Sequence, residues 1–290
     1  MDVVSDAISA VRLGHPSSER VRKSCSWCTR LDPFGGAGFH VVLKGGCRLL
    51  PDDGAPVSLG VGDAVLLPHG TGHVLTERPQ RGETEILCGR YRLDCSRIHP
   101  LLAEMPQVVH LPSRVGGHRE LRAAIDLLAG ELDERLPGAC VALPHLLDLL
   151  LVYMIRAWMT EATSGAWPRV LGDPVTAGAL RALHSDPAAP WTTERLAAEV
   201  NVSRPTLARR FTTLVGRPPM AYLTWWRIIL TATLLRDTSE TLASIAGRVG
   251  YGSPYALSHA FQREFGTTPG RYRKAAREAS APPPHAEIGP

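Results

Sequence analysis

The most constraining feature of this sequence is a stretch that occurs twice near its C-terminal end. The two copies share pairs of matching residues: Ala197 and Ala246, Val200 and Val249, Pro205 and Pro254, Phe211 and Phe261, and Gly216 and Gly266. The first three pairs have one constant separation, and the last two pairs are one residue further apart. We therefore expect one extra residue near the start of the second helix of the second copy. A repeated pattern requires two independent coincidences, so it constrains the fold more than a single motif does.

Each copy predicts two short helices joined by a tight turn, which is a helix-turn-helix unit. In the first copy, Thr192 or Thr193 caps the first helix and Ser203 caps the second. In the second copy, Gly250 supplies the turn and Ser253 supplies the cap. The prolines that follow both serines fall in the first helical turn, where a missing N–H costs nothing. Between the copies, residues 220–236 form a helix that is apolar nearly all round, so we expect it to pack against both units and fix the distance between them.

Residues 192–273 resemble the DNA-binding domain of AraC/XylS-type transcription regulators. The marks of this family are the Gly250-Tyr251 turn, the run at 261–269 and the closing Arg271-Tyr272-Arg273. The resemblance implies two recognition helices that enter successive major-groove segments on one face of the duplex. Charge agrees, because residues 191–278 hold roughly twice as many basic as acidic residues whereas residues 1–190 are nearly balanced. The basic surplus lies where DNA phosphates are expected.

The outward faces of the two recognition helices predict the DNA contacts. With Leu207 and Phe211 inside, we expect base contacts from Arg204, Thr206 and Arg209, and Arg209 is expected to read guanine through its bidentate fork. The second helix offers fewer strong readers, which are Ser253, Tyr255, Ser258 and His259. Phosphate contacts are expected from Arg195, Arg210, Arg263 and Arg273.

The region from about 25 to 95 changes to short strands and turns rich in glycine and proline. Residues 39–50 alternate in polarity, residues 52–54 are a hairpin signal, and residues 64–67 and 85–93 are further strands. Within this region, Gly62, Pro68, Gly70 and His73 have the spacing of the second motif of cupin barrels. Residues 20–110 therefore resemble the cupin-type sensor domain of this regulator family. The resemblance implies an inward-pointing histidine at the mouth of a barrel.

The first cupin motif, with its paired histidines and downstream glutamate, is absent. The three-histidine, one-carboxylate iron site of enzymatic cupins therefore cannot form in its usual positions. The remaining candidates for a metal or effector site are His40, Cys47, His69, His73 and Cys88. We expect His40, His73 and Cys88 to converge with His69 or Cys47 as a fourth partner, a donor set that suits zinc or another divalent metal.

Other roles are open for these residues. The cysteines are also typical small buried residues, and single histidines in a barrel are often hydrogen-bonded core groups. Cys25 and Cys28 have the spacing of a zinc knuckle or a dithiol. The cupin part is also similar to regulators that sense reactive chlorine through cysteines, and this similarity implies thiol sensing.

The predicted fold class is α+β with two domains. A cupin-like β-barrel with a helical dimerisation segment occupies 1–163, and a linker follows at 164–174. The all-α domain of two helix-turn-helix units joined by a long helix spans 175–278, and 279–290 are a disordered tail. We also predict a helix at 2–13 and helices within 119–162 that break at Pro137-Gly138. These last helices are expected to close the barrel, to form a dimer interface, or both.

The sequence thus predicts a DNA-binding transcription regulator, and not an enzyme, that responds to a small molecule, a metal or an oxidant in its barrel. Its expected partners are double-stranded DNA, RNA polymerase and a second copy of the chain. No signal core and no run of about 18 apolar residues is present, which predicts a cytoplasmic protein without a membrane partner. Two alternatives are a metal-dependent cupin enzyme fused to a DNA-binding domain and an architectural DNA-binding protein with a structural barrel.

Overall fold

The computed structural model describes residues 3–11, 16–24, 26–77, 82–92, 99, 103–113, 117–134, 136–161 and 166–280. The chain divides into two compact units, Ala7–Pro168 and a second unit made of Met1–Asp6 and Arg169–Pro290. Helix α1 (Val3–Val11) is shared between them, so the first residues of the predicted 1–163 domain group with the C-terminal unit. The division falls inside the predicted linker, where a short helix α5 (Ala166–Gly172) forms. The predicted tail at 281–290 lies outside the described residues.

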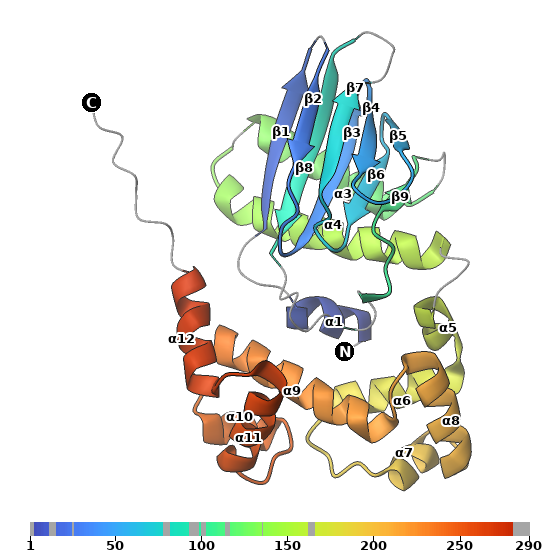
Figure 1. Ribbon diagram of the computed structural model, residues 1–290, viewed down its shortest axis with the longest axis vertical. Coiled ribbons are helices and arrows are strands. Elements are labelled where there is room, and N and C mark those ends of the chain that lie inside the picture. Colours follow the sequence, from blue (N-terminus) through green and yellow to red (C-terminus); the bar gives the residue numbers. More distant parts are fainter. Residues whose placement is uncertain are drawn as a thin grey trace. The chain divides into compact units, whose positions relative to one another are not determined.

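The N-terminal unit contains two antiparallel sheets (Figure 1). One has the order β1-β8-β3-β6-β9 and the other the order β2-β7-β4-β5. The strands are β1 (Ser17–Lys23), β2 (Cys28–Leu31), β3 (Ala37–Lys44), β4 (Gly46–Pro51), β5 (Val57–Gly60), β6 (Ala64–Leu67), β7 (His73–Glu77), β8 (Thr84–Tyr91) and β9 (Val109–Leu111). This arrangement confirms the cupin-like part of the predicted fold.

The predicted strands and turns are found with small shifts at their ends. Strand β6 has the predicted bounds, and β8 begins one residue earlier than expected. The hairpin signal at 52–54 joins β4 to β5. Between β3 and β4, Gly45 has φ 73° and a Cβ there would lie 2.5 Å from the Glu83 carbonyl oxygen. Only glycine therefore fits at this turn.

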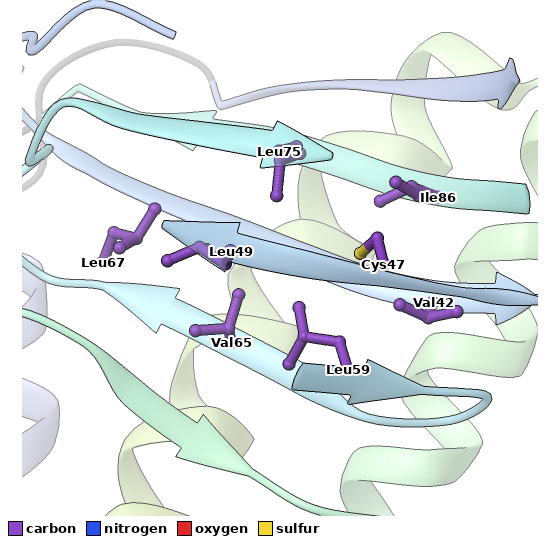
Figure 2. Close-up of a cluster of buried hydrophobic side chains, with 8 residues drawn as sticks. All are labelled: Val42, Cys47, Leu49, Leu59, Val65, Leu67, Leu75 and Ile86. Atoms are coloured by element: carbon purple, nitrogen blue, oxygen red, sulfur yellow. The ribbon is translucent and has the colours of Figure 1, made fainter. Parts of the chain in front are cut away.

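The core of this unit is a cluster of aliphatic side chains between the two sheets (Figure 2). It consists of Val42, Cys47, Leu49, Leu59, Val65, Leu67, Leu75 and Ile86, which are 0–3% exposed. Burying each large aliphatic side chain contributes about 1.5–3 kcal/mol before the cost of lost chain entropy. Cys47 lies inside this cluster, so it packs as a small hydrophobic residue.

Helices α3 (Arg119–Glu134) and α4 (Ala139–Glu161) pack against each other and contact the sheet of β1 and β9. The predicted break at Pro137-Gly138 is confirmed, and α4 begins directly after it at Ala139. Both helices leave apolar side chains exposed, namely Leu127, Leu136, Val141 and Leu149 in and between them. Among the described helices, α4 alone is long and apolar enough to cross a membrane. Core helices of soluble proteins can have the same length and composition.

The C-terminal unit is helical, as predicted. Its helices are α6 (Pro174–Ser185), α7 (Thr193–Glu199), α8 (Arg204–Val215), α9 (Pro219–Asp237), α10 (Leu242–Arg248), α11 (Pro254–Phe265) and α12 (Pro269–Ser280). The predicted caps Thr192, Ser203 and Ser253 each accept a hydrogen bond from a backbone N–H of the first turn. One detail of the repeat was wrong. The extra residue lies in the turn before Ser253, because the two recognition helices have equal length.

Helix α9 packs against both helix-turn-helix units, which confirms the predicted role of residues 220–236. On one side, Tyr222 lies edge-on to Phe211 of α8. On the other side, Ile228, Ala232 and Leu235 share a buried cluster with α10 and α11. A buried polar group completes this unit, since His184 Nδ1 lies 2.9 Å from the Asp6 carboxylate and His184 Nε2 lies 2.8 Å from the Tyr222 hydroxyl.

Candidate functional site

The first recognition helix, α8, presents arginines on its exposed face. Leu207 and Phe211 are fully buried, and Arg204 and Arg209 are exposed. The Arg204 guanidinium makes a 2.9 Å ion pair with Glu194 of α7, and both side chains are more than half exposed. An ion pair of this kind is worth at most about 1 kcal/mol, so a base or phosphate can replace Glu194. The exposed Arg209 stays a predicted base contact, and Arg204 would have to give up its pairing with Glu194 to contact DNA.

The other predicted DNA contacts of the first helix-turn-helix unit already have partners within the C-terminal part of the chain. The Thr206 hydroxyl lies 2.8 Å from the Ser203 hydroxyl. The Arg195 guanidinium stacks 4.8 Å over the Trp191 ring, and Arg210 lies 3.5 Å from Asp173. These contacts hold the cations at the rim of α7 and α8. Their placement is consistent with the predicted phosphate contacts, which stay predictions.

The second recognition helix, α11, is less basic and more aromatic. Tyr255 is 76% exposed, and its ring lies 5.5 Å from the ring of His259, one turn further along. The Ser253 hydroxyl accepts the Ala256 N–H at 3.1 Å, so its first role is to cap the helix. Ser258 is half-buried. Tyr255 and His259 are therefore the most accessible of the four predicted readers on this helix.

The two remaining predicted phosphate contacts, Arg263 and Arg273, differ in their surroundings. Arg263 is exposed on α11. Arg273 of α12 instead donates to the backbone carbonyls of Leu235 and Glu240, so it holds α12 against the end of α9. Arg271 on the same helix is exposed and was not among the predicted contacts. The closing Arg-Tyr-Arg run contains both arginines. Only their packing in the structure shows that Arg271 is exposed and that Arg273 binds backbone carbonyls.

In the N-terminal unit, three of the five candidate sensor residues form a chain of hydrogen bonds between side chains. His40 of β3 lies directly opposite Cys88 of β8, and its Nδ1 is 3.1 Å from the Cys88 sulfur. His40 Nε2 lies 2.8 Å from His73 Nε2, and His73 belongs to β7 of the other sheet. Both imidazoles are only 3% exposed. The chain thus crosses between the two sheets.

The hydrogen-bonding partners fix the direction of this chain. His73 Nδ1 lies 2.8 Å from the Thr71 carbonyl oxygen, which can only accept, so this nitrogen carries a proton. A neutral His73 then has a bare Nε2 that accepts the Nε2–H of His40. His40 Nδ1 is consequently bare and accepts the thiol proton of Cys88. With this proton arrangement, all three side chains are neutral and each of their hydrogen bonds has one donor and one acceptor.

The pKa values agree with a neutral chain. Burial lowers the pKa of His40 to about 3, and the neighbouring His73 adds to this effect. Burial also lowers the pKa of His73 and raises the pKa of the Cys88 thiol to about 12. Burial of Cys88 outweighs the nearby Arg90, so the thiol is neutral in this arrangement.

The other two candidates lie apart from the chain. Cys47 is in the apolar core, and His69 Nε2 donates to the Met105 carbonyl at 2.9 Å. Among the residues described, no group of three His, Cys, Asp or Glu side chains is arranged to hold a metal ion. Two nitrogens on one tetrahedral zinc lie roughly 3.4 Å apart with both lone pairs facing the ion. The two imidazoles face each other instead, so the predicted metal site does not fit this arrangement. Cys25 lies outside the described residues.

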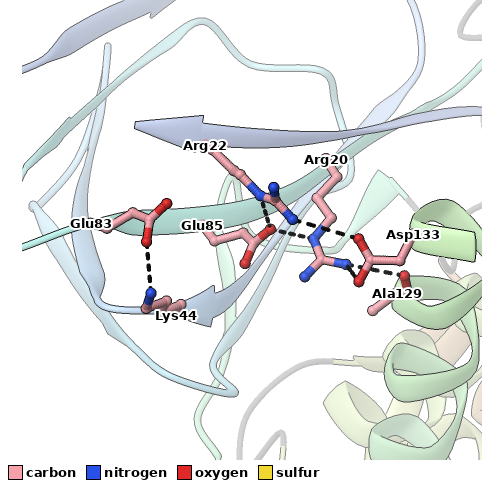
Figure 3. Close-up of polar contacts among 7 residues, drawn as sticks. All are labelled: Arg20, Arg22, Lys44, Glu83, Glu85, Ala129 and Asp133. Atoms are coloured by element: carbon pink, nitrogen blue, oxygen red, sulfur yellow. Dashed lines mark hydrogen bonds and ion pairs between the residues drawn. The ribbon is translucent and has the colours of Figure 1, made fainter. Parts of the chain in front are cut away.

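A network of charges joins the same strand β8 to the helices (Figure 3). The Glu85 carboxylate pairs with Arg20 and Arg22 of β1. Both arginines also pair with Asp133 of α3, and Arg20 donates to the Ala129 carbonyl at 3.3 Å. Hydrogen bonds from the two arginines lower the pKa of Glu85 to about 2. A cavity of about 1000 Å³ lies beside this network, lined by Arg20, Asp133, Leu136, Cys140 and Leu143 among others.

Comparison with known proteins agrees with both halves of this structure. Residues 2–160 match a cupin family and residues 196–275 match a helix-turn-helix domain family. An AraC-like transcription regulator of Streptomyces lividans is 33% identical over 94% of this chain and 98% of its own. The RCS-specific HTH-type transcriptional activator RclR of Escherichia coli K12 is 28% identical over 94% and 99% of the two chains.

A solved structure with a similar C-terminal part is the DNA-binding domain of AdpA in complex with a target DNA. It is 34% identical, covers 37% of this chain and 96% of its own, and has a TM-score of 0.35. The two family matches fall on the two units of the fold, and the Streptomyces lividans relative extends over both. This chain is therefore a DNA-binding transcription regulator of the AraC family with a cupin-type N-terminal domain.

Proposed function

We propose that DNA binding by this regulator responds to an oxidant that reacts with Cys88. The supporting observation is the buried chain Cys88–His40–His73, which crosses between the two sheets. The name of the relative RclR, an RCS-specific activator, is consistent with a reactive chlorine species as the oxidant. Hypochlorous acid would convert the thiol to a sulfenic acid, with chloride and a proton released.

The neutral state of the thiol predicts selectivity among oxidants. A thiol with its pKa raised to about 12 holds almost no thiolate at neutral pH, and weak oxidants react mainly with thiolates. Oxidation also adds an oxygen atom to a side chain that packs against the apolar core. Close-packed interiors transmit such changes, because they have no void to absorb an added atom. The hydrogen bond from Cys88 to His40 is lost in the same step.

Strand β8 offers a route from Cys88 to the helices. It carries Cys88 and also Glu85, and Glu85 is tied through Arg20 and Arg22 to Asp133 of α3. A shift of β8 would change how α3 packs against the sheet, and α4 would move because it packs against α3. We infer that these helices join two copies of the chain, because Leu127, Leu136 and Val141 are 52–67% exposed apolar side chains on one segment.

The remaining predicted features are part of the same proposal. The regulator acts on double-stranded DNA in the cytoplasm, contacts RNA polymerase and carries out no catalysis of its own. A small-molecule effector is a second candidate, favoured by the cavity beside Asp133, whose volume is in the range of ligand sites. Metal binding stays a prediction as well, and would require His40 to turn away from His73.

The test measures DNA affinity of the full chain before and after treatment with hypochlorous acid, with hydrogen peroxide as the comparison oxidant. The DNA is a duplex selected by the untreated protein from a random pool. Cys88→Ser should abolish the response, and His73→Ala should change its size. The exposed free cysteines Cys28 and Cys140 supply matched controls, because Cys28→Ser and Cys140→Ser should respond as the unchanged chain does. A full response in Cys88→Ser would refute the proposal. Metal analysis of the same samples tests the metal alternative.

A further inference from the structure

The two helix-turn-helix units touch each other at the turn of the second unit. Gly250 lies in this turn with φ 80°. A Cβ on Gly250 would lie 2.8 Å from both the Cα and the carbonyl oxygen of Ala188. Ala188 belongs to the loop between α6 and α7 of the first unit. The backbones of the two units therefore approach more closely than any side chain at position 250 allows.

An arginine from the connecting helix α9 spans this contact. Arg227 Nε donates to the Pro187 carbonyl at 2.7 Å, and its Nη2 donates to the Ala189 carbonyl at 3.0 Å. The same Nη2 would lie 2.8 Å from a Cβ on Gly250. The guanidinium thus binds the residues on both sides of Ala188 and covers the Gly250 turn. Its half-buried position lowers the pKa of Arg227 through desolvation, and the nearby Asp186 opposes this effect.

The first unit shows that the turn conformation alone does not require glycine. Its corresponding residue is Asn201, which adopts φ 54° with an exposed side chain. Asparagine tolerates the left-handed region better than most residues. The difference between the two turns is the neighbour, since Asn201 faces solvent and Gly250 faces Ala188. Close approach between the units is therefore the reason for glycine at position 250.

The contact adds a second constraint to the packing of α9. A helix that packs into both units fixes their separation along its axis. A contact away from this axis additionally opposes rotation of one unit about it. We propose that Arg227, Gly250 and the 187–189 loop form a joint that fixes the angle between α8 and α11, and so selects the spacing of the two DNA segments. These are positioning residues, which act through the recognition helices.

The test compares the spacing preference of full-length variants. A duplex selected from a random pool by the unchanged protein is altered by inserting one to five base pairs between its two protected segments. Two further duplexes keep only one segment each. A rigid pair of readers gains from both segments only at one geometry. The unchanged chain should therefore lose about tenfold or more in affinity when the spacing changes by two base pairs.

Gly250→Asn and Arg227→Ala should flatten this profile. We expect about a tenfold loss on the parent duplex, less than about a threefold difference among spacings, and unchanged affinity for the single segments. Asparagine is the substitution of choice because it accepts the backbone conformation. Arg227→Lys should give an intermediate profile, since one ammonium group cannot hold both carbonyls in the same fork.

Each variant has a matched control within the chain. Gly266→Asn introduces the same residue at φ 68° with no atom within 4 Å of the new Cβ. Arg273→Ala removes a guanidinium that donates to two backbone carbonyls, those of Leu235 and Glu240, inside one unit. Both controls should keep the spacing profile even if overall affinity falls. The inference is overturned if Gly250→Asn and Arg227→Ala keep the profile, or lose single-segment affinity as strongly as parent affinity. It rests on both units reading DNA, which the footprint of the unchanged chain tests separately.

Discussion

The imidazole of His40, from one sheet, donates to the imidazole of His73, from the other, with 2.8 Å between their Nε2 atoms. Two neutral rings can share a proton in this way, whereas two charged rings would repel each other in a site that excludes water. Burial lowers the pKa of both rings, so the pair stabilises the barrel most while both rings are neutral. This makes the stability of the N-terminal unit depend on pH.

The direction of the effect follows from the pKa values. An unfolded histidine takes up a proton near pH 6.5, whereas the pKa of buried His40 is lowered to about 3. Acid therefore favours the unfolded state, and stability is lost as the pH falls from 6.5 toward 3. The loss from His40 is on the order of 2 kcal/mol at pH 5. Urea denaturation of the full chain from pH 8 to 5 measures it, and His40→Gln should show a weaker dependence. A stability that rises with acid over this range would be incompatible with neutral rings.

Ionisation of the Cys88 thiol sets an upper limit on the pH range in which the N-terminal unit is most stable. Burial raises the pKa of Cys88 from 9.0 to about 12, so the stabilising neutral thiol is fully present below pH 9. Stability should fall as the pH rises from 9 toward 12, because the unfolded thiol ionises first. Cys88→Ser should remove this loss, which denaturation at pH 8 and pH 10 can measure. An unchanged slope in the serine variant would assign the loss to another group.

Glu85 and Glu83 offer a matched pair of carboxylates near one end of the same sheet (Figure 3). Glu85 is 8% exposed and binds two arginines, while Glu83 forms an exposed pair with Lys44. Glu85→Gln should cost about 1–3 kcal/mol of unfolding free energy, because it weakens hydrogen bonds to two guanidinium groups. Glu83→Gln should cost less than about 1 kcal/mol. Urea denaturation at pH 7 provides both values. Equal losses would show that the network contributes no more than a surface ion pair.

The apolar surface of α3 and α4 predicts self-association. Val141 is 67% exposed at the start of α4, so Val141→Asp should weaken a dimer formed through this surface. Val61, which is 54% exposed in a turn of the barrel, provides the control substitution Val61→Asp. Sedimentation equilibrium of the three proteins gives the dissociation constants. A dimer that Val61→Asp disrupts and Val141→Asp does not would place the interface elsewhere.

Base reading by Arg209 predicts a specific pattern of loss. Its side chain is exposed on α8 between the buried Leu207 and Phe211. Arg209→Ala should cost about 1–3 kcal/mol on a selected duplex and relax the preference at one base position. Competition with single-base variants of that duplex measures both quantities. If affinity for random DNA falls equally, Arg209 contacts phosphate.

Local interactions made much of this fold predictable. Ser203 and Ser253 cap their helices through hydrogen bonds that span only three residues, so the sequence pattern identifies them directly. The linker was harder, because helix α5 (Ala166–Gly172) forms inside the range predicted as a linker. The extra residue of the second copy was misplaced because proline fits at either of the first two helical positions.

The sensor residues depended on long-range pairing. Cys47 and Cys88 both lie on strands, and only the register decides which one meets a histidine. Cys88 lies opposite His40, whereas Cys47 lies opposite Leu59 and joins the apolar core. The raised pKa of Cys88 likewise depends on burial, which is a property of the packed barrel. The contact of Arg227 with the 187–189 loop had no signal in the sequence at all.

We propose that the two recognition helices, α8 and α11, read DNA as one rigid pair. A hydroxyl-radical footprint of the full chain on a duplex selected from a random pool tests it most directly. Two major-groove segments about one helical turn apart should be protected on one face of the duplex. Substitution of Tyr255 by alanine should weaken protection of only one of them. Protection of a single segment by the unchanged chain would contradict the account, because α11 would then take no part in recognition.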